Sequence, residues 1–511
     1  MPVARPDHND LAAISTDRGL GLSAQDIAAY SPIVDGLLGS FDVVERLYCK
    51  TAPAATTDRA WNRPAERDNR LGAWYVQCTV TGTSDGPLAG RTVAIKDNTQ
   101  VAGVPMMNGS KTLEGFVPVR DATIVTRLLA AGATITGKAV CEDLCFSGGS
   151  HTSRTGPVRN PWDPSRSAGG SSSGSAVLVA IGAADMATGG DQGGSIRMPS
   201  SYSGIVGLKP THGLVPYTGA FPIEQTLDHV GPMARSVADA ALMLSVIAGR
   251  DSLDPRQPRD LVVEDYLGSL DASPSGLRIG VLAEGFAIPG ISDPQVDESV
   301  RDAIDVLSKL GVTVEHVSVP LHRDGIHLWN VLAGEGAATQ MIDDNAYGLN
   351  WQGLYDPELI AYYGRQWRTM PHEFSTTVKA VLLATTHTVN TGFGRYYAMG
   401  RNVALELRKA YEAAMENFDA LVMPTVPLTA TPLPAADAGP AEIFDRALEH
   451  LGNTAPFDIS GNPAITVPAG QVNGLPTGLM IVGKHFKDAT ILRLARAYER
   501  EVGGFPSPPA L

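Results

Sequence analysis

The chain has 511 residues, of which 43% are hydrophobic and 18% charged, and its formal net charge is −14. This is the composition of a globular protein long enough to bury a large core. The negative balance disfavours nucleic acid and anionic membrane surfaces as partners. No stretch approaches 18 consecutive apolar residues, and the opening MPVARPDHND has no apolar signal segment. We therefore expect a cytoplasmic protein without a spanning helix.

The four cysteines are too few for a disulfide framework in so long a chain. Cys141 and Cys145 lie four positions apart, as one half of a metal site would. No second pair at zinc-like spacing completes four ligands. We expect two small buried thiols on one helix face, a reducing compartment and no metal.

The N-terminal segment predicts a helix over residues 20–47. Ser23 and Asp26 resemble a capping box, and an apolar stripe follows them. The polar stretch at 51–70, which contains proline and arginine, is typical of a linker. We take residues 1–75 as a helical N-terminal extension.

The body alternates strand-like and helical segments. A helix is expected at 121–133, capped by Asp121 and ending near Gly132. Another lies within SAVLVAIGAADMATGGD, and a third follows residue 293 and leads into a strand. Strand-like runs stand at 91–97, 134–140, 185–188 and 277–282. This alternation predicts an α/β fold with a mixed or largely parallel sheet.

Residues 321–440 differ from the rest, since they are richer in Trp, Tyr and His and end in a proline-rich run. We expect them to form an inserted helical cap over the sheet. The catalytic core would then comprise residues 76–320 and 441–511.

Three segments have residues suited to chemistry: VAIKDN with Lys96, AGGSSSGSA at 168–176, and GGDQGGSIRMP at 189–199. In the third, paired glycines leave backbone amides uncovered before a serine, which suits a tetrahedral oxyanion. Asp191 and Arg197 flank this loop with opposite charges. The alternative is a turn that only lets a helix pack closely; the phosphate-loop pattern is absent.

Ser172 fits the G-x-S-x-G pattern of a hydrolase nucleophile, but that pattern requires a preceding strand. The stretch before it is broken by proline and glycine, and His212, His229 and His485 stand in no telling context. A serine can instead be activated by a buried lysine, because a low dielectric favours the neutral amine. Lys96 would be that lysine, unless it is a surface lysine with a buried stem.

Together these motifs resemble the amidase signature family over about residues 75–511. Ser171 precedes Ser195 by 24 positions and follows Lys96 by 75. Further segments, such as GVPMMNGS and GLKPTHGLVPYTGAFPIE, are similar to the enantioselective amidases of nitrile-degrading actinobacteria. Residues 321–455 match these relatives little, which leaves the substrate open. The implied fold is a central mixed β-sheet with helices on both faces.

The resemblance also implies the catalytic groups. Lys96 would be the base, Ser195 the nucleophile, and Ser171 a proton relay joined to Gly170 by a cis peptide bond. Gly170, Asp191 and Arg197 would support the two loops. The implied oxyanion donors are the backbone N–H groups of Gln192, Gly193, Gly194 and Ser195. No metal or organic cofactor is implied.

The implied reaction is hydrolysis of an amide to an acid and ammonia or an amine, through an acyl-enzyme and with esterase side activity. We expect a neutral aliphatic or aryl acyl group, since no arginine is identifiable as a carboxylate binder. Phe146 and Trp329 are expected to line the pocket, with plain core packing as the alternative. The resemblance further implies a homodimer formed through residues 1–75; otherwise these helices pack on their own body.

Three other functions stay open. One is a carbamate or aryl-acylamide hydrolase that uses the same three residues. Another is the ammonia-supplying component of a glutamine-dependent aminoacyl-tRNA amidotransferase, and the last is a non-catalytic binding protein.

Overall fold

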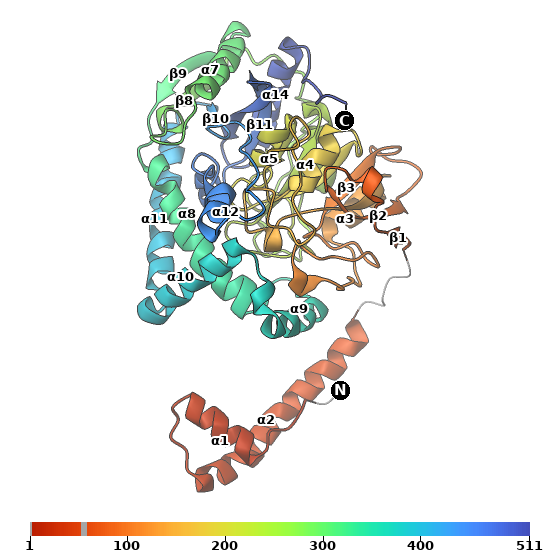
Figure 1. The fold of residues 1–511 in the computed structure, drawn as a ribbon, viewed down its shortest axis with the longest axis vertical. Coiled ribbons are helices and arrows are strands. Elements are labelled where there is room, and N and C mark those ends of the chain that lie inside the picture. The colour runs from red at the N-terminus through yellow and green to blue at the C-terminus, as the bar shows by residue number, and fades with distance from the viewer. Residues whose placement is uncertain (1–2, 53–58, 511) are drawn as a thin grey trace. The chain divides into compact units, whose positions relative to one another are not determined.

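The computed structural model describes residues 3–52 and 59–510, and the chain divides into two compact units, Met1–Thr56 and Thr57–Leu511. The first unit contains helices α1 (His8–Asp17) and α2 (Ala24–Thr51), which pack on each other (Figure 1). Ser23 and Asp26 cap α2 reciprocally, so the predicted capping box is confirmed.

Helix α2 leaves an apolar stripe uncovered. Its exposed members recur every three or four residues along one face, and each is 49–64% exposed: Tyr30, Ile33, Leu37, Phe41, Val44 and Leu47. By length and composition alone, α2 could also cross a membrane, with a mean hydropathy of 1.3 in its most apolar window. The sequence predicts no spanning helix when only uninterrupted apolar runs are considered. Polar residues interrupt the apolar ones along α2, so that criterion does not detect this helix.

The second unit is built on one mixed 12-stranded sheet in the order β1-β2-β4-β3-β5-β7-β6-β11-β12-β10-β8-β9. Parallel pairs join β3 to β4 and β5, and β8 to β9 and β10. The strands are β1 (Trp61–Asn62), β2 (Trp74–Thr81), β3 (Thr92–Lys96), β4 (Thr134–Ala139), β5 (Met186–Asp191), β6 (Val206–Lys209), β7 (His229–Ala234), β8 (Arg278–Leu282), β9 (Thr313–Val317), β10 (Ala420–Pro424), β11 (Ala464–Val472) and β12 (Leu475–Gly483).

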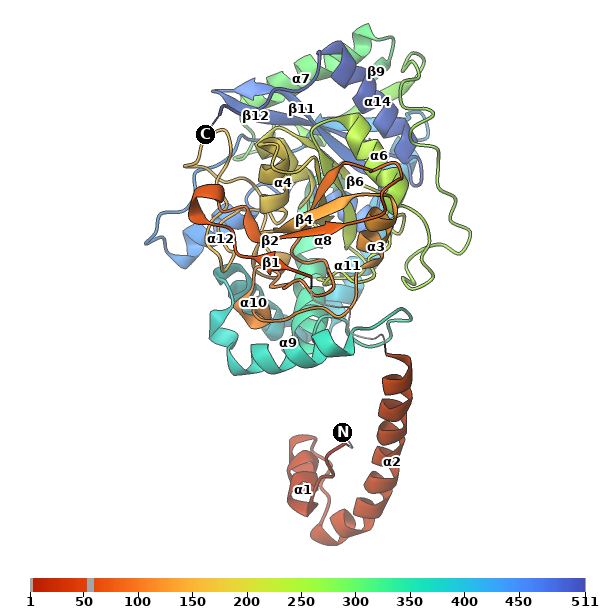
Figure 2. The same cartoon turned by 90° about the vertical axis from the view of Figure 1, so that its right-hand side faces the viewer.

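Helices pack against this sheet, and Figure 2 shows α7 and α14 beside β11 and β12 at one end of it. Helix α4 lies on β5, α6 on β7, and α5 and α14 on β12. The helices are α3 (Thr123–Ala130), α4 (Ser173–Ala180), α5 (Arg197–Ser203), α6 (Val237–Ile247), α7 (Pro294–Lys309), α8 (Leu321–Gly336), α9 (Pro357–Thr369), α10 (Thr376–Gly392), α11 (Arg395–Ala414), α12 (Pro440–Leu448), α13 (Pro456–Ser460) and α14 (Asp488–Glu501). The predicted α/β class is confirmed.

The extension ends earlier than residue 75. Strand β1 pairs with β2 at the edge of the main sheet, and Arg59 forms an ion pair with Asp121. These contacts make the stretch after residue 58 part of the body, although its polar composition predicts a linker. Residues 53–58 lie outside the described part of the chain.

The predicted cap also ends earlier. Helices α8 to α11 fill most of 321–440, but β10 lies between β12 and β8 inside the sheet. Strand β10 has only five residues and a proline-rich run follows it, so the composition of this segment does not predict a strand.

The predicted N-cap of helix α3 is wrong as well. Asp121 accepts hydrogen bonds from Ala102 and Arg59 rather than from the first turn of the helix.

Candidate active site

Two parallel neighbouring strands place Lys96 beside the serine-rich loop at residues 168–176. Strand β3 ends at Lys96 and β5 ends at Asp191, so both carboxyl ends meet at one edge of the sheet. Lys96 Nζ lies 2.8 Å from Ser171 Oγ and donates to the Gly190 carbonyl at 3.2 Å. Both Lys96 and Ser171 are fully buried. The interpretation of Lys96 as a surface lysine is therefore wrong.

The three adjacent serines have different partners. Ser172 Oγ donates to the Gly190 carbonyl and accepts from its N–H, both at 3.2 Å. Ser173 Oγ donates to Glu142 at 2.9 Å, a carboxyl whose pKa burial raises to about 7. Of the three, the described contacts place Ser171 alone on Lys96.

The G-x-S-x-G interpretation fails on geometry. Loop, not strand, precedes Ser172. The three histidines that could have completed a triad contact backbone carbonyls instead: His212 that of Gln225, His229 that of Leu227, and His485 that of Ser460.

Glycine at position 170 is required by close packing. A Cβ built there would lie 2.0 Å from the Gly149 carbonyl oxygen, so no side chain fits without moving the backbone. The peptide bond between Gly170 and Ser171 is cis.

Ser195 stands between β5 and α5 and lines a cavity, with 6% of its surface exposed. Its carbonyl accepts from Ser172 N–H at 3.3 Å, which ties the two serine loops together. Among the described residues, no hydrogen bond joins the Ser171 and Ser195 hydroxyls. Catalytic hydrogen bonds often shorten only when substrate binds.

Asp191 and Arg197 form a buried ion pair under this loop. Arg197 donates to both carboxylate oxygens of Asp191, at 2.9 and 3.0 Å, and to Asp458 at 2.6 Å. Burial alone would raise the pKa of Asp191, but the charge and hydrogen bonds of Arg197 outweigh it and hold that pKa below its usual range. Burial and the neighbouring Asp191 raise the pKa of Asp458.

The predicted oxyanion donors need one correction. The N–H of Gly194 donates to Asp191 Oδ1 at 2.6 Å, so that amide supports the loop and is not free for an oxyanion. Within the described ranges, no protein acceptor is found for the N–H groups of Gln192, Gly193 and Ser195. Spacing alone does not reveal the difference, because it does not show which N–H group the Asp191 carboxylate accepts from.

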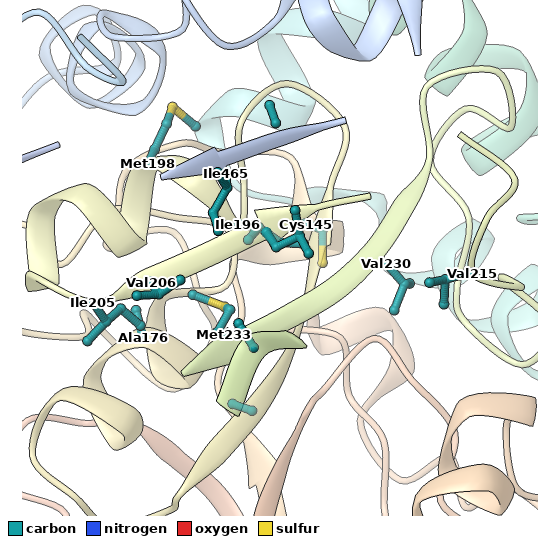
Figure 3. Packing of buried hydrophobic residues seen from close by; sticks show 14 of the residues in the cluster. Cys145, Ala176, Ile196, Met198, Ile205, Val206, Val215, Val230, Met233 and Ile465 are labelled. Carbon is teal, nitrogen blue, oxygen red and sulfur yellow. The ribbon is translucent and has the colours of Figure 1, made fainter. Parts of the chain in front are cut away.

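Two further side chains hold the loop. Trp329 Nε1 donates to the Gln192 carbonyl and Thr454 Oγ1 to the Gly193 carbonyl, both at 2.6 Å. These two hydrogen bonds fix the orientation of the two peptide groups. Figure 3 shows the core at its base, where Ile196 and Met198 lie near Ile465 of β11.

The cavity beside Ser195 is narrow and mostly apolar. Phe146 and Trp329 line it, with their ring centroids 6.1 Å apart and the rings stacked, so both predicted pocket residues border the same cavity as Ser195. Its free volume is about 20 Å³, room for one water. A group larger than a water molecule would therefore fit only if lining side chains moved. The other lining residues are Cys145, Ser147, Gly148, Gln192, Gly193, Ile223, Leu227, Ala333, Leu448 and Leu451.

The two neighbouring cysteines are buried, but not on one helix face. Cys145 ends a short 3-10 turn with φ 59°, and it lines the cavity. Burial alone would raise the pKa of its thiol, but Cys141 and the nearby Lys96 lower that pKa to about 7. No sequence pattern predicts this placement. Over residues 3–52 and 59–510, no group of three or more His, Cys, Asp or Glu could hold a metal ion.

The sequence model of the Amidase family matches residues 42–492, which contain this whole constellation. The chain belongs to the amidase signature family. It is 53% identical over 508 residues to the enantioselective amidase of Rhodococcus rhodochrous, an alignment covering 99% of this chain and 97% of that relative.

Solved structures of amidase signature proteins share the fold. A glutamyl-tRNA(Gln) amidotransferase subunit from Thermotoga maritima superposes with a TM-score of 0.72 at 31% identity, covering 87% of this chain and 92% of its own. The peptide amidase from Stenotrophomonas maltophilia gives 0.67 at 32% identity, covering 83% and 85%. The chain is an amidase.

Proposed function

We propose that this amidase hydrolyses neutral carboxylic amides to an acid and ammonia, with Ser195 as the nucleophile. The observation that carries the proposal is the 2.8 Å contact between Lys96 Nζ and Ser171 Oγ at the base of the loop bearing Ser195. A buried amine beside a hydroxyl is a proton acceptor that needs no histidine.

In the proposed acylation step, neutral Lys96 takes the Ser171 proton while Ser171 takes that of Ser195. Ser195 Oγ bonds to the carbonyl carbon, and the N–H groups of Gln192, Gly193 and Ser195 hold the oxyanion. The proton then returns through Ser171 to the nitrogen, the C–N bond breaks and ammonia leaves. Water attacks the acyl-enzyme by the same route.

The acyl group is proposed to be neutral and aliphatic or aryl. No Asp, Glu, Lys or Arg is among the described residues that line the cavity, so a charged acyl group would be desolvated without a partner. Aromatic walls from Phe146 and Trp329 suit a flat or branched apolar group, and walls of fixed chirality can distinguish its enantiomers. Carbamates and aryl acylamides fit the same nucleophile and remain the second candidate.

An amidotransferase role is less supported. The relative named an enantioselective amidase is 53% identical to this chain over 508 residues, whereas the Thermotoga maritima amidotransferase subunit is 31% identical. We also propose a cytoplasmic location, since all four cysteines are free.

Trapping the acyl group tests the proposal. A fluorophosphonate probe should label the protein in a 1:1 ratio, and peptide mapping should place the adduct on Ser195. Ser172→Ala removes a hydroxyl whose described hydrogen bonds go to Gly190 alone; it serves as the matched control and should still be labelled. An adduct on any other residue, or no adduct in an active preparation, would overturn the assignment of the nucleophile.

We further propose that the N-terminal unit forms a homodimer. The exposed stripe on α2 spans five turns, and burying it against a second copy removes large apolar side chains from water. Such a contact is self-complementary under two-fold symmetry.

Changing the stripe tests the dimer. Leu37→Glu with Phe41→Glu should convert a dimer to a monomer in analytical ultracentrifugation while amide hydrolysis persists. Arg46→Glu, a single change outside the stripe, serves as the control. A wild-type monomer would contradict the proposal, and binding of the wild-type chain to lipid vesicles would assign the stripe to a membrane instead.

A further inference from the structure

The side-chain oxygen of Gln192 (Oε1), three positions before the proposed nucleophile, is buried without a hydrogen-bond partner among the described residues. Gln192 is one of the residues that line the cavity, and only 3% of its surface is exposed. A buried amide oxygen without a donor is costly, because it has lost water and gained nothing. The proposed mechanism uses the backbone of Gln192 but not this side chain.

The hydroxyl of Tyr217 fixes which end of the amide is the oxygen. That hydroxyl donates its single hydrogen to the Phe221 carbonyl at 3.2 Å. It can then only accept, and it does so from Gln192 Nε2 at 3.0 Å and Asn98 Nδ2 at 3.5 Å. The flipped amide would set Oε1 against the lone pairs of the hydroxyl. Oε1 therefore remains the free acceptor.

The Gln192 amide lies on the same side of the site as the base. The position that a Cβ of Gly190 would occupy is 3.4 Å from Lys96 Nζ and 3.5 Å from Gln192 Nε2. The amine and the amide thus border one small region. Ser171 Oγ lies 2.8 Å from Lys96 Nζ, so in the proposed mechanism the proton returns to the leaving nitrogen near this region.

We propose that Gln192 Oε1 accepts a hydrogen bond from an N–H of the substrate's leaving nitrogen. Gln192 thereby selects amides over esters of the same acid. An amide nitrogen carries a hydrogen throughout the reaction and gains another as Ser171 protonates it. The leaving oxygen of an alkyl ester has none until it is protonated, and its lone pairs face Oε1. The inference rests on the proposed nucleophile and relay.

The test compares a primary amide with the methyl ester of the same acid. Each kcat/KM value reports only the steps through acylation, because deacylation follows the irreversible release of the leaving group, so the ratio compares acylation by the two substrates. Gln192→Met keeps the length of the side chain and removes the acceptor, and it should lower the amide-to-ester ratio about tenfold. Tyr217→Phe, which frees the amide to flip, should lower the ratio by a smaller factor.

Phe146→Leu is the matched control, since it alters the acyl side and should change both substrates by the same factor. A ratio within twofold of wild type in Gln192→Met overturns the inference. If Gln192→Met is too unstable to assay, an unchanged ratio in Tyr217→Phe overturns it instead. Failure of the underlying mechanism is recognised separately, because the wild-type protein would then form no acyl-enzyme at Ser195 from either substrate.

Discussion

Replacing Lys96 by alanine is expected to lower kcat/KM for a primary amide by about 10⁴-fold, and for a p-nitrophenyl ester of the same acid by about 10²-fold. An amide needs a base for Ser195 and then an acid for its nitrogen, and both protons pass through Lys96. The nitrophenolate leaves without a proton, so the ester loses only the first contribution. Steady-state rates on the two substrates measure the difference.

Lys96→Arg separates the base from the positive charge. A guanidinium stays protonated in proteins, so this variant should resemble Lys96→Ala on amides. Ser172→Ala, in the same loop, should keep most activity on both substrates. An equal loss on amide and ester in Lys96→Ala would show that Lys96 does not protonate the leaving group.

Arg197→Met is expected to destabilise the protein by about 3–5 kcal/mol. Arg197 is fully buried between Asp191 and Asp458, and removing it leaves two carboxylates close together without their cation. The repulsion would also loosen the Gly194 amide that Asp191 holds. Urea unfolding followed by tryptophan fluorescence measures the loss.

The control for this variant is Arg408→Met. Arg408 pairs with Glu412 on α11, and both side chains are about half exposed. Exposed pairs contribute about 0–1 kcal/mol. A loss below 1 kcal/mol in Arg197→Met would mean that Asp191 and Asp458 are neutralised by protonation, and that the ion pair does not support the loop.

Local patterns predicted much of the fold. Strands β3, β4, β8 and β9 and helix α7 lie where apolar periodicity predicts them, because each is one regular element bounded by turn residues. Strand β10 and the short strand β1 were missed. Both depend on pairing with segments distant in the chain, which no local window contains.

Within the site, burial on a strand does not by itself distinguish Lys96 from two other lysines. Lys96, Lys138 and Lys209 all lie on strands and are all fully buried. In the sheet, Lys138 is the register partner of Ile95 and pairs with Asp97, while Lys209 donates to the Asn462 carbonyl. Only Lys96 reaches a serine, and sheet register decides this.

The sequence by itself determined the family, the α/β class and the two glycine-rich serine loops, because these depend on residue types at fixed spacings. Only the tertiary structure decided that Gly194 donates to Asp191 and that Gln192 Oε1 has no partner among the described residues. Each of these depends on which donor meets which acceptor across segments far apart in the chain. Hydrogen bonds are directional and short-ranged, so the folded geometry alone settles them.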